Sequence, residues 1–354
     1  MSAEPQRQSS PQTIAAPCSV TNPAAQWQQG ELALRDNFVL ESGATLRNAK
    51  LAWRCVGPAE APLIVVLGGI SAHRRVCAVE PENTYGRGWW ESQCGANKVL
   101  DTTRFRLLGV DWLGGCDAST GPRSDAWQES EFPSISTADQ ARALLLLLNR
   151  LGVRRVHLVV GASYGGNVAQ QLAALLGDRL RRLVLLSAAH RPAQFGLALR
   201  HVQRAILDLG GTAAAGEALA LARSLAVLGY RTPEGIEQRF GAAQATMDCS
   251  ESVNDWIDHH GSKFIKRFNA DAYRCLGRSL DTHEIDPAAI RVPTTLFAVR
   301  EDLTVPLSLL REYAERAGSA CELVEISSTY GHDAFLKEDA AVSAVFAQAL
   351  ETTA

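Results

Sequence analysis

Six short segments of the chain are rich in apolar residues, and they predict strands buried on both faces of a sheet. Nearly continuous runs of valine, leucine and isoleucine are typical of parallel strands that helices cover on both sides. The segments are residues 63–67, 105–110, 156–160, 183–186, 294–299 and 322–326. Two further segments, residues 32–34 and 46–53, predict antiparallel strands at an edge of the same sheet.

Between these strands the period of the apolar residues becomes helical. Residues 139–151 carry leucines on nearly every face, which predicts a deeply buried helix, and residues 167–176 predict a second helix. A repeated order of strand, loop and helix is the pattern of an α/β fold. The sequence therefore predicts a mostly parallel central sheet flanked by helices.

This repeating pattern is interrupted once. Alanine, leucine and arginine dominate residues 192–286 and the period there is helical throughout, which predicts a helical lid inserted into the core. The α/β core then consists of residues 31–191 and 287–354. Residues 1–30 are rich in proline, glutamine, serine and alanine and show neither period, so we expect a flexible N-terminal extension.

Composition and charge exclude several classes of protein. The chain has 354 residues, of which 46% are hydrophobic and 21% charged, as in ordinary globular proteins. A formal charge of -3 argues against general nucleic-acid binding, and no apolar stretch reaches the roughly 18 residues of a membrane span. The 8 cysteines are scattered without metal-ligand spacing, and no N-terminal signal pattern is present. We therefore expect free thiols in a cytoplasmic protein that needs no metal or redox cofactor.

The strongest chemical signal is the segment 161–165, Gly-Ala-Ser-Tyr-Gly, which matches the G-x-S-x-G nucleophile elbow. An apolar strand ends at Val160 and a helix is expected after Gly166, which is the strand-turn-helix setting that this motif requires. Small residues flank the serine because it occupies a strained turn that other backbone segments approach closely. The motif predicts Ser163 as the nucleophile of an α/β-hydrolase fold.

A serine hydroxyl is a poor nucleophile until a base removes its proton, so a histidine oriented by a carboxylate must exist. His332 is the best placed of the 8 histidines, because it follows the last predicted strand and completes the chain order serine, acid, histidine of this fold. Asp302 comes directly after the strand at 294–299 and is the expected acid. Its neighbour Glu301 is the competing choice.

Attack by a serine produces an oxyanion, which needs backbone N–H donors. In this fold one donor belongs to the residue after the nucleophile, here Tyr164, and the other to the loop after an earlier strand. That loop begins with Gly68 and Gly69, and both glycines are expected near the oxyanion.

Several longer motifs resemble the homoserine O-acyltransferase family. Residues 115–124 (GCDASTGPRS) are similar to its G-S-T-G-P-x-S segment, and residues 132–139 (FPSISTAD) to its F-P-x-I-[ST]-x-x-D. Residues 263–273 (KFIKRFNADAY) are close to its K-F-x-x-R-F-D-A-N-S-Y, and residues 331–336 (GHDAFL) resemble its C-terminal segment. The resemblance covers most of the chain, from about residue 32 to residue 340.

This resemblance implies an enzyme that moves an acetyl or succinyl group from CoA to the side-chain hydroxyl of L-homoserine through an acyl-serine, in methionine biosynthesis. By position it implies that Arg204 binds the carboxylate of the amino acid, because a guanidinium fork suits a bidentate contact. It also implies that Asp333 binds the ammonium group, and that the enzyme is a homodimer associating through the lid. L-Serine is the alternative acceptor.

Basic residues offer further contacts for the donor. Arg74 or Arg75 could pair with a succinyl carboxylate. The phosphates of CoA could meet basic residues of the lid, among them Arg200, Arg223, Lys263 and Lys266.

Two alternatives of other classes remain. An esterase or thioesterase would use the same three residues, since the fold alone does not fix the acceptor. A comparison of the rate of acyl transfer to an added amino acid with the rate of hydrolysis distinguishes a transferase from an esterase or thioesterase. A non-enzymatic binding module would have no need of an aligned serine, histidine and aspartate.

Overall fold

The centre of the molecule is a nine-stranded sheet in the computed structural model, which describes residues 19–22, 27–34, 38–79, 87–127, 131–244 and 252–351. In sheet order the strands are β1 (Ser19–Asn22), β2 (Trp27–Ala33), β5 (Lys50–Val56), β9 (Arg106–Val110), β6 (Leu63–Leu67), β10 (Leu158–Ala162), β11 (Leu183–Leu186), β12 (Thr294–Val299) and β13 (Cys321–Ile326). From β9 to β13 each strand is parallel to the next, whereas β1, β2 and β5 are antiparallel to their neighbours. The predicted mostly parallel sheet is confirmed.

Helices cover both faces of this sheet. The flanking helices are α2 (Thr137–Arg150), α3 (Tyr164–Leu176), α9 (Leu307–Arg316) and α10 (Asp339–Glu351). On β11, Leu183 and Leu185 pack in a cluster with α2 and α3, whereas Val184 and Leu186 pack in a second cluster with α10. All four side chains are fully buried. Successive side chains of a strand point to opposite faces, so these two clusters form the two halves of the core, as the continuous apolar runs predict.

Two helices begin earlier than their hydrophobic period suggests. α2 begins at Thr137, where Ser136 and Asp139 form a capping box that satisfies two otherwise free N–H groups. α3 begins at Tyr164, whereas the sequence places its start after Gly166. The two glycines after the serine look like a turn in the sequence, but they belong to the first turn of the helix.

The sheet also begins earlier than predicted. β1 and the first residues of β2 lie within residues 1–30, the segment expected to be a flexible extension, and β2 pairs with β5 along its whole length, from Trp27 opposite Val56 to Ala33 opposite Lys50. Trp27 is buried, but it stands among glutamines and leaves little periodic signal. Residues 1–18 and 23–26 lie outside the described residues.

Short elements complete the core. They are the strands β3 (Phe38–Val39), β4 (Thr45–Leu46), β7 (Cys94–Gly95) and β8 (Leu100–Asp101), and the 3-10 helices η2 (Asp125–Trp127), η3 (Gly177–Arg179), η4 (Pro287–Ala289) and η5 (Gly331–Leu336). The strand predicted at 46–53 is therefore divided between β4, which pairs with β3, and β5, which joins the main sheet.

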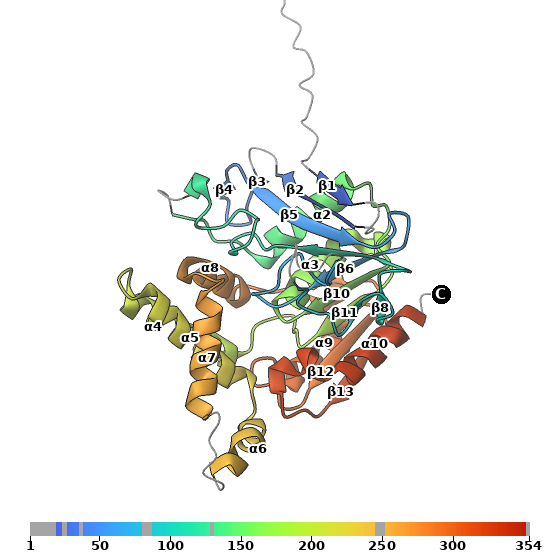
Figure 1. Cartoon of the computed structure of the whole chain (residues 1–354). Coiled ribbons are helices and arrows are strands. Elements are labelled where there is room, and N and C mark those ends of the chain that lie inside the picture. The colour runs from blue at the N-terminus through green and yellow to red at the C-terminus, as the bar shows by residue number, and fades with distance from the viewer. Residues whose placement is uncertain are drawn as a thin grey trace, which may run out of the picture.

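A group of helices is inserted between β11 and β12. These are α4 (Gln194–Gly210), α5 (Ala215–Tyr230), α6 (Pro233–Gln244), α7 (Val253–Ile265) and α8 (Ala270–Asp281). Figure 1 shows α4, α5, α7 and α8 standing together at one side of the core. Several large apolar side chains of α4 and α5 are exposed, Leu209 most of all at 89%. These side chains leave apolar surface on the inserted helices.

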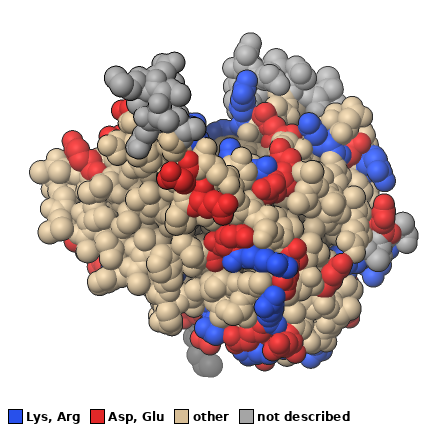
Figure 2. Space-filling view, turned by 90° about the horizontal axis from the view of Figure 1, so that it is seen from below, with Lys and Arg blue, Asp and Glu red and all other residues tan. Residues whose placement is uncertain are grey.

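The surface carries charges of both signs. Figure 2 shows acidic and basic side chains interspersed on the face that it displays, between wide areas of uncharged residues. The helices in the part of the chain that the structure describes include none that could span a lipid bilayer.

Candidate active site

The turn between β10 and α3 places one serine at the carboxyl end of the sheet. Ser163 has φ +52° and ψ -122°, a left-handed conformation that a residue with a side chain adopts only under strain. Glycines allow the surrounding backbone to approach. A Cβ atom at Gly165 would lie 2.4 Å from the carbonyl carbon of Leu67, and one at Gly161 would lie 2.5 Å from the carbonyl oxygen of Gly165. The motif therefore has the geometry of a nucleophile elbow.

The structure brings together the three side chains that the sequence selects. His332 Nε2 lies 2.8 Å from Ser163 Oγ, and His332 Nδ1 lies 2.7 Å from Asp302 Oδ2. The other oxygen of Asp302 accepts hydrogen bonds from Thr304 N, Thr304 Oγ1 and Val305 N, each at 2.9 Å. With Asp302 ionised, Nδ1 donates to the carboxylate, which leaves Nε2 free to accept from the serine hydroxyl.

Glu301 faces another partner. Its carboxylate accepts hydrogen bonds from Ser327 Oγ at 2.7 Å and from Ser328 N at 2.8 Å. The register at the end of β12 therefore directs Asp302, and not its neighbour, toward the histidine.

The environment of His332 adjusts its basicity in two directions. Burial by itself lowers the pKa of His332, because a low dielectric disfavours the charged ring. The negative charge of Asp302 and the hydrogen bond to it outweigh burial, so the pKa of His332 is raised above its ordinary value. The ring is thus a stronger base than a free imidazole while it stays in contact with the serine.

The loop after β6 is held from outside by side chains. Trp112 Nε1 donates to the Gly69 carbonyl and Trp89 Nε1 to the His73 carbonyl, both at 3.0 Å, and Arg267 donates to the Ser71 carbonyl. Every second carbonyl group from Gly69 to His73 therefore accepts a hydrogen bond from a side chain outside the loop. Sequence reasoning missed these two tryptophans. Trp89 follows a glycine and Trp112 follows a predicted strand, but neither position marks a contact with this loop.

The two glycines of this loop have different surroundings. A Cβ atom at Gly68 would lie 2.5 Å from Ala72 Cβ, and the Gly68 carbonyl accepts from Gly165 N at 2.8 Å, so Gly68 packs the loop onto the elbow. A Cβ atom at Gly69 would meet nothing within 4 Å, and Gly69 lines a cavity that also contains Ser163. Of the two, Gly69 is the one that faces the space where an oxyanion would form.

The ring of Tyr164 points away from the catalytic residues, so only its backbone N–H is available to the site. Its phenol is fully buried, lies 2.9 Å from Ser279 Oγ and accepts a hydrogen bond from Gln140 Nε2 at 3.2 Å. The ring packs edge-on against Trp112. The side chain therefore ties α3 to α2 and α8, while its N–H lies at the start of the helix, where intrahelical partners are lacking.

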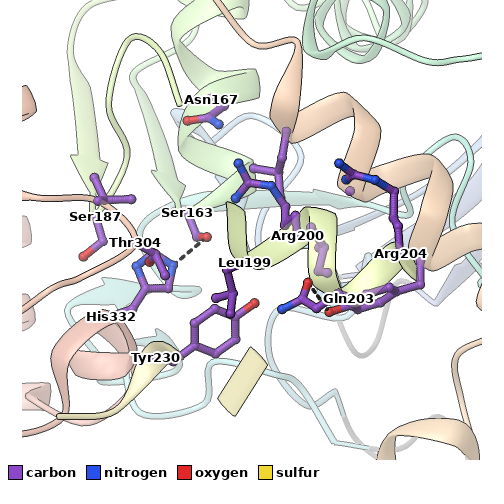
Figure 3. Close-up of a pocket in the computed structure, with 15 residues that line it drawn as sticks. Ser163, Asn167, Ser187, Leu199, Arg200, Gln203, Arg204, Tyr230, Thr304 and His332 are labelled. Atoms are coloured by element: carbon purple, nitrogen blue, oxygen red, sulfur yellow. Dashed lines mark hydrogen bonds between the residues drawn. The ribbon is translucent and has the colours of Figure 1, made fainter. Parts of the chain in front are cut away.

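Ser163 and His332 line two cavities at once. We call the smaller one, of about 60 Å³, the first chamber; it also contains Asn167, Arg200 and Arg204 (Figure 3). Figure 3 shows the Ser163 side chain directed at His332, and Arg200, Gln203 and Arg204 extending from α4. We call the larger one, of about 180 Å³, the second chamber; its lining includes Gly69, Trp89, Arg223, Arg267 and Asp333. Ile70 and Tyr230 border both.

The first chamber contains two guanidinium groups and one neighbouring carboxylate. Arg204 Nη1 lies 2.6 Å from Asp281 Oδ2, and Arg200 Nε contacts the other oxygen of Asp281. The Nη1 atom of Arg204 is buried, and its approach to Asp281 lacks the angles of a hydrogen bond. Two positive charges against one negative charge leave this group of residues with an excess of one positive charge.

The chain is similar to proteins of one enzymatic class. A model of the α/β-hydrolase fold matches residues 62–339. Homoserine O-succinyltransferase of Xanthomonas campestris is 40% identical over 312 residues, which are 87% of this chain and 80% of that protein. Homoserine O-acetyltransferase of Thermus thermophilus is 36% identical over 279 residues, 73% of this chain and 70% of that protein. The chain belongs to the homoserine O-acyltransferase family of α/β-hydrolase enzymes.

Solved structures agree on the fold of this homoserine O-acyltransferase family member. The crystal structure of homoserine O-acetyltransferase from Bacillus anthracis superposes with a TM-score of 0.81 at 18% identity, over 92% of this chain and 97% of that one. The esterase E22 superposes with a TM-score of 0.79 at 20% identity, over 92% of this chain and 100% of that one. Transferases and esterases thus share this architecture, and the predicted α/β-hydrolase fold is confirmed.

The two acceptor contacts that the family resemblance implies line different chambers. Arg204 lines the first chamber, whereas Asp333 lines the second. The Asp333 carboxylate lies 3.1 Å from Arg231 Nη2, so its charge is already paired. An ammonium group would have to compete with Arg231 for this carboxylate.

The structure assigns other places to two of the expected donor contacts. Arg74 is tied to Asp111, with Nη1 2.5 Å from Oδ2 and its backbone N 2.7 Å from Oδ1, and neither Arg74 nor Arg75 lines a chamber. Arg200, expected near the phosphates of CoA, lies in the first chamber with Arg204. Its signal in the sequence is the spacing of four residues, which puts both arginines on one face of a helix.

Proposed function

We propose that this enzyme transfers a short acyl group from a CoA thioester to the side-chain hydroxyl of L-homoserine, by a ping-pong route in which Ser163 carries the acyl group. The observation that carries the proposal is that one serine and one histidine border two chambers. A donor bound in the second chamber and an acceptor bound in the first would reach the same nucleophile from different sides. A double displacement requires only that donor and acceptor each reach the same nucleophile in turn, and the two chambers offer each substrate a place beside Ser163.

In the first half of the reaction, His332 Nε2 takes the proton of Ser163, whose Oγ attacks the thioester carbonyl. The N–H of Tyr164 and one N–H of the loop at Gly69 are our proposed donors to the oxyanion. The tetrahedral intermediate collapses, the carbon–sulfur bond breaks, and the thiol leaves with the proton from His332. The acyl group is then an ester of Ser163.

In the second half, His332 takes the proton of the homoserine hydroxyl, and that oxygen attacks the acyl-serine. The serine oxygen leaves and recovers a proton from His332, which restores the enzyme. Water competes with homoserine at this step, so the helices over the site must hold the acceptor while they limit the entry of water. The product, an O-acylhomoserine, fits the place in methionine biosynthesis that the family resemblance implies.

The charge of the first chamber supports an amino acid as acceptor. Arg200 and Arg204 share the single carboxylate of Asp281, so a substrate carboxylate would supply the missing negative charge. A guanidinium binds a carboxylate through two parallel N–H bonds, which fixes direction as well as affinity. L-Serine has the same carboxylate and one methylene fewer, and it is the acceptor against which homoserine should be compared.

Intact-mass spectrometry tests the proposed route. Brief exposure to acetyl-CoA or succinyl-CoA is expected to add one acyl mass to the protein, located at Ser163 by peptide mapping. Adding L-homoserine should then remove that mass faster than buffer alone and yield O-acylhomoserine. If water removes it as fast as homoserine or serine does, the enzyme is a thioesterase and the proposal is wrong.

A variant of Arg204 tests the acceptor chamber separately. In Arg204→Gln the charge-assisted contact to the acceptor carboxylate is lost, and we expect the KM for homoserine to rise by about 10- to 100-fold. The rate at which Ser163 is acylated should change by less than about 3-fold, because the donor occupies the other chamber. Steady-state kinetics give the first quantity and rapid-quench mass spectrometry the second. Arg278→Gln, at an exposed position of α8 that lines neither chamber, is the control and should alter neither.

A further inference from the structure

We propose that Arg223 and Arg267 form an anion subsite in the second chamber, which binds a negatively charged oxygen group of the acyl donor. This inference rests on the proposed acyl transfer through Ser163 and adds to it the residues that recognise the donor. Both side chains line the chamber that also contains Ser163 and His332. Arg223 comes from α5, and Arg267 follows the end of α7.

The charges of these two arginines are not neutralised by the protein. Among the described residues, neither guanidinium has a carboxylate oxygen within 4.0 Å. The neighbouring cations differ in this respect, since Arg231 is paired with Asp333 and Arg74 with Asp111. The second chamber therefore has, beside the nucleophile, two arginines that form no ion pair within the described residues.

Each guanidinium is held in place by contacts that leave N–H groups available. The guanidinium carbon of Arg223 lies 4.9 Å from the ring centroid of Phe264 and 5.5 Å from that of Tyr230. These contacts use the faces of aromatic rings and not the N–H edges of the guanidinium. Arg267 Nη2 donates a hydrogen bond to the Ser71 carbonyl, in the loop that contains Gly69, and its other N–H groups remain available. Planar guanidinium edges suit carboxylate and phosphate oxygens.

Other charges near Arg267 leave this region positive. Burial lowers the pKa of His73 to about 3, with Arg267 and Arg75 contributing in the same direction, so this imidazole is uncharged at neutral pH. Asp117 is the carboxylate that faces these arginines, and burial followed by the charge of Asp111 raises its pKa. Arg267, Arg75 and Arg74 act on Asp117 in the opposite direction, so one carboxylate stands among three arginines here.

An acyl-CoA carries two kinds of group that fit this subsite. One is the distal carboxylate of a dicarboxylic acyl group such as succinyl, and the other is a phosphate of CoA itself. Both present oxygens with negative charge to a guanidinium. Four thioesters separate them: succinyl-CoA, acetyl-CoA, and the succinyl and acetyl thioesters of N-acetylcysteamine, which lack the phosphates.

The test measures the rate at which each thioester acylates Ser163, by rapid quench and intact-mass spectrometry. In Arg223→Gln and Arg267→Gln this rate should fall by about 10- to 100-fold for donors that carry the recognised anion. Loss confined to both succinyl donors identifies the carboxylate, and loss confined to both CoA donors identifies a phosphate. A lower acylation rate with succinyl-CoA, acetyl-CoA and succinyl-N-acetylcysteamine means that the subsite binds both the carboxylate and a phosphate. S-Acetyl-N-acetylcysteamine should react with the variants as fast as with the wild type.

Two outcomes would overturn the subsite while leaving acyl transfer intact. They are an equal loss with all four donors, which indicates a structural role, and no loss with any of them. Arg223→Lys and Arg267→Lys keep the charge and should recover part of the rate, and they replace the glutamine variants if those do not fold. Lys337→Gln removes an exposed charge that lines neither chamber and should change no rate. A wild-type enzyme that no donor acylates would overturn the acyl transfer itself.

Discussion

Replacing Ser163 with alanine is expected to lower the turnover of acyl transfer by roughly 10⁵- to 10⁶-fold. The hydroxyl is 2.8 Å from His332 Nε2 and lies between the two chambers, so no covalent intermediate can form without it. Any residual rate would come from direct attack of homoserine on a bound thioester near the oxyanion donors. The measurement is the formation of O-acylhomoserine, together with the intact mass after exposure to the donor.

The variant should fold as well as the wild type. Alanine is smaller than serine, and the elbow places a side chain at positive φ in either protein, so the backbone strain is unchanged. Ser262→Ala, at an exposed position of α7, is the matched control and should keep full activity. If Ser163→Ala still accepted an acyl mass and passed it to homoserine, another residue would be the nucleophile. A binding-module function would gain support if Ser163→Ala bound ligands unchanged and the wild type had no turnover.

The triad could be predicted because each of its members follows a recognisable strand. Ser163 follows the apolar run 156–160, Asp302 follows 294–299 and His332 follows 322–326. The carboxyl ends of parallel strands meet at one edge of a sheet, so residues far apart in the chain come together there. The hydrogen bonds among the three side chains agree with that expectation.

The chambers could not be predicted, because they depend on how the lid helices lie over the core. Arg200 and Arg204 share one helix face by their spacing, but only the packing of α8 brings Asp281 between them. In the same way, Arg267 reaches Ser71 across 196 positions of the sequence. Such contacts leave no period or motif in a single sequence.

Edge strands were predicted at 32–34 and 46–53, but β1 and the first residues of β2 were missed, for a different reason. The strand β2 contains two glutamines and a glycine, and Trp27 is its one buried residue. Its place in the sheet therefore depends on backbone hydrogen bonds to β5 more than on an apolar face. Hydrophobic alternation is a poor guide to such a strand. The long apolar strands at the centre have the opposite balance, and their places were predicted to within about two residues.

Arg74 and Asp111 illustrate how a functional expectation changes when burial is known. In the sequence Arg74 is a free cation near the expected oxyanion loop. In the structure Asp111 is almost fully buried, and it accepts from Arg74 twice and from Ala118 N at 3.0 Å. A buried carboxylate needs such partners, so the arginine serves to hold the loop and is not available to a substrate.

Replacing Asp302 with asparagine is expected to lower the acylation rate by about 10⁴-fold. An asparagine amide can donate to His332 Nδ1, which favours the ring with its proton on Nε2. That nitrogen would then face Ser163 as a donor and could not accept the hydroxyl proton. Glu301→Gln is the matched control, because the Glu301 carboxylate binds Ser327 and Ser328 and not the histidine.

The same variant should also change the pH dependence of the reaction. Acylation needs the unprotonated ring, so the rate in the wild type falls as the pH drops through the raised pKa of His332. Without the Asp302 charge, burial is the largest remaining influence on that pKa, and burial lowers it. The acidic limb of the profile should therefore move to lower pH in Asp302→Asn, while the plateau stays about 10⁴-fold lower. The measurement is kcat/KM for the donor between about pH 5 and pH 9. A limb that stayed in place or moved to higher pH would mean that Asp302 does not control the charge of this histidine.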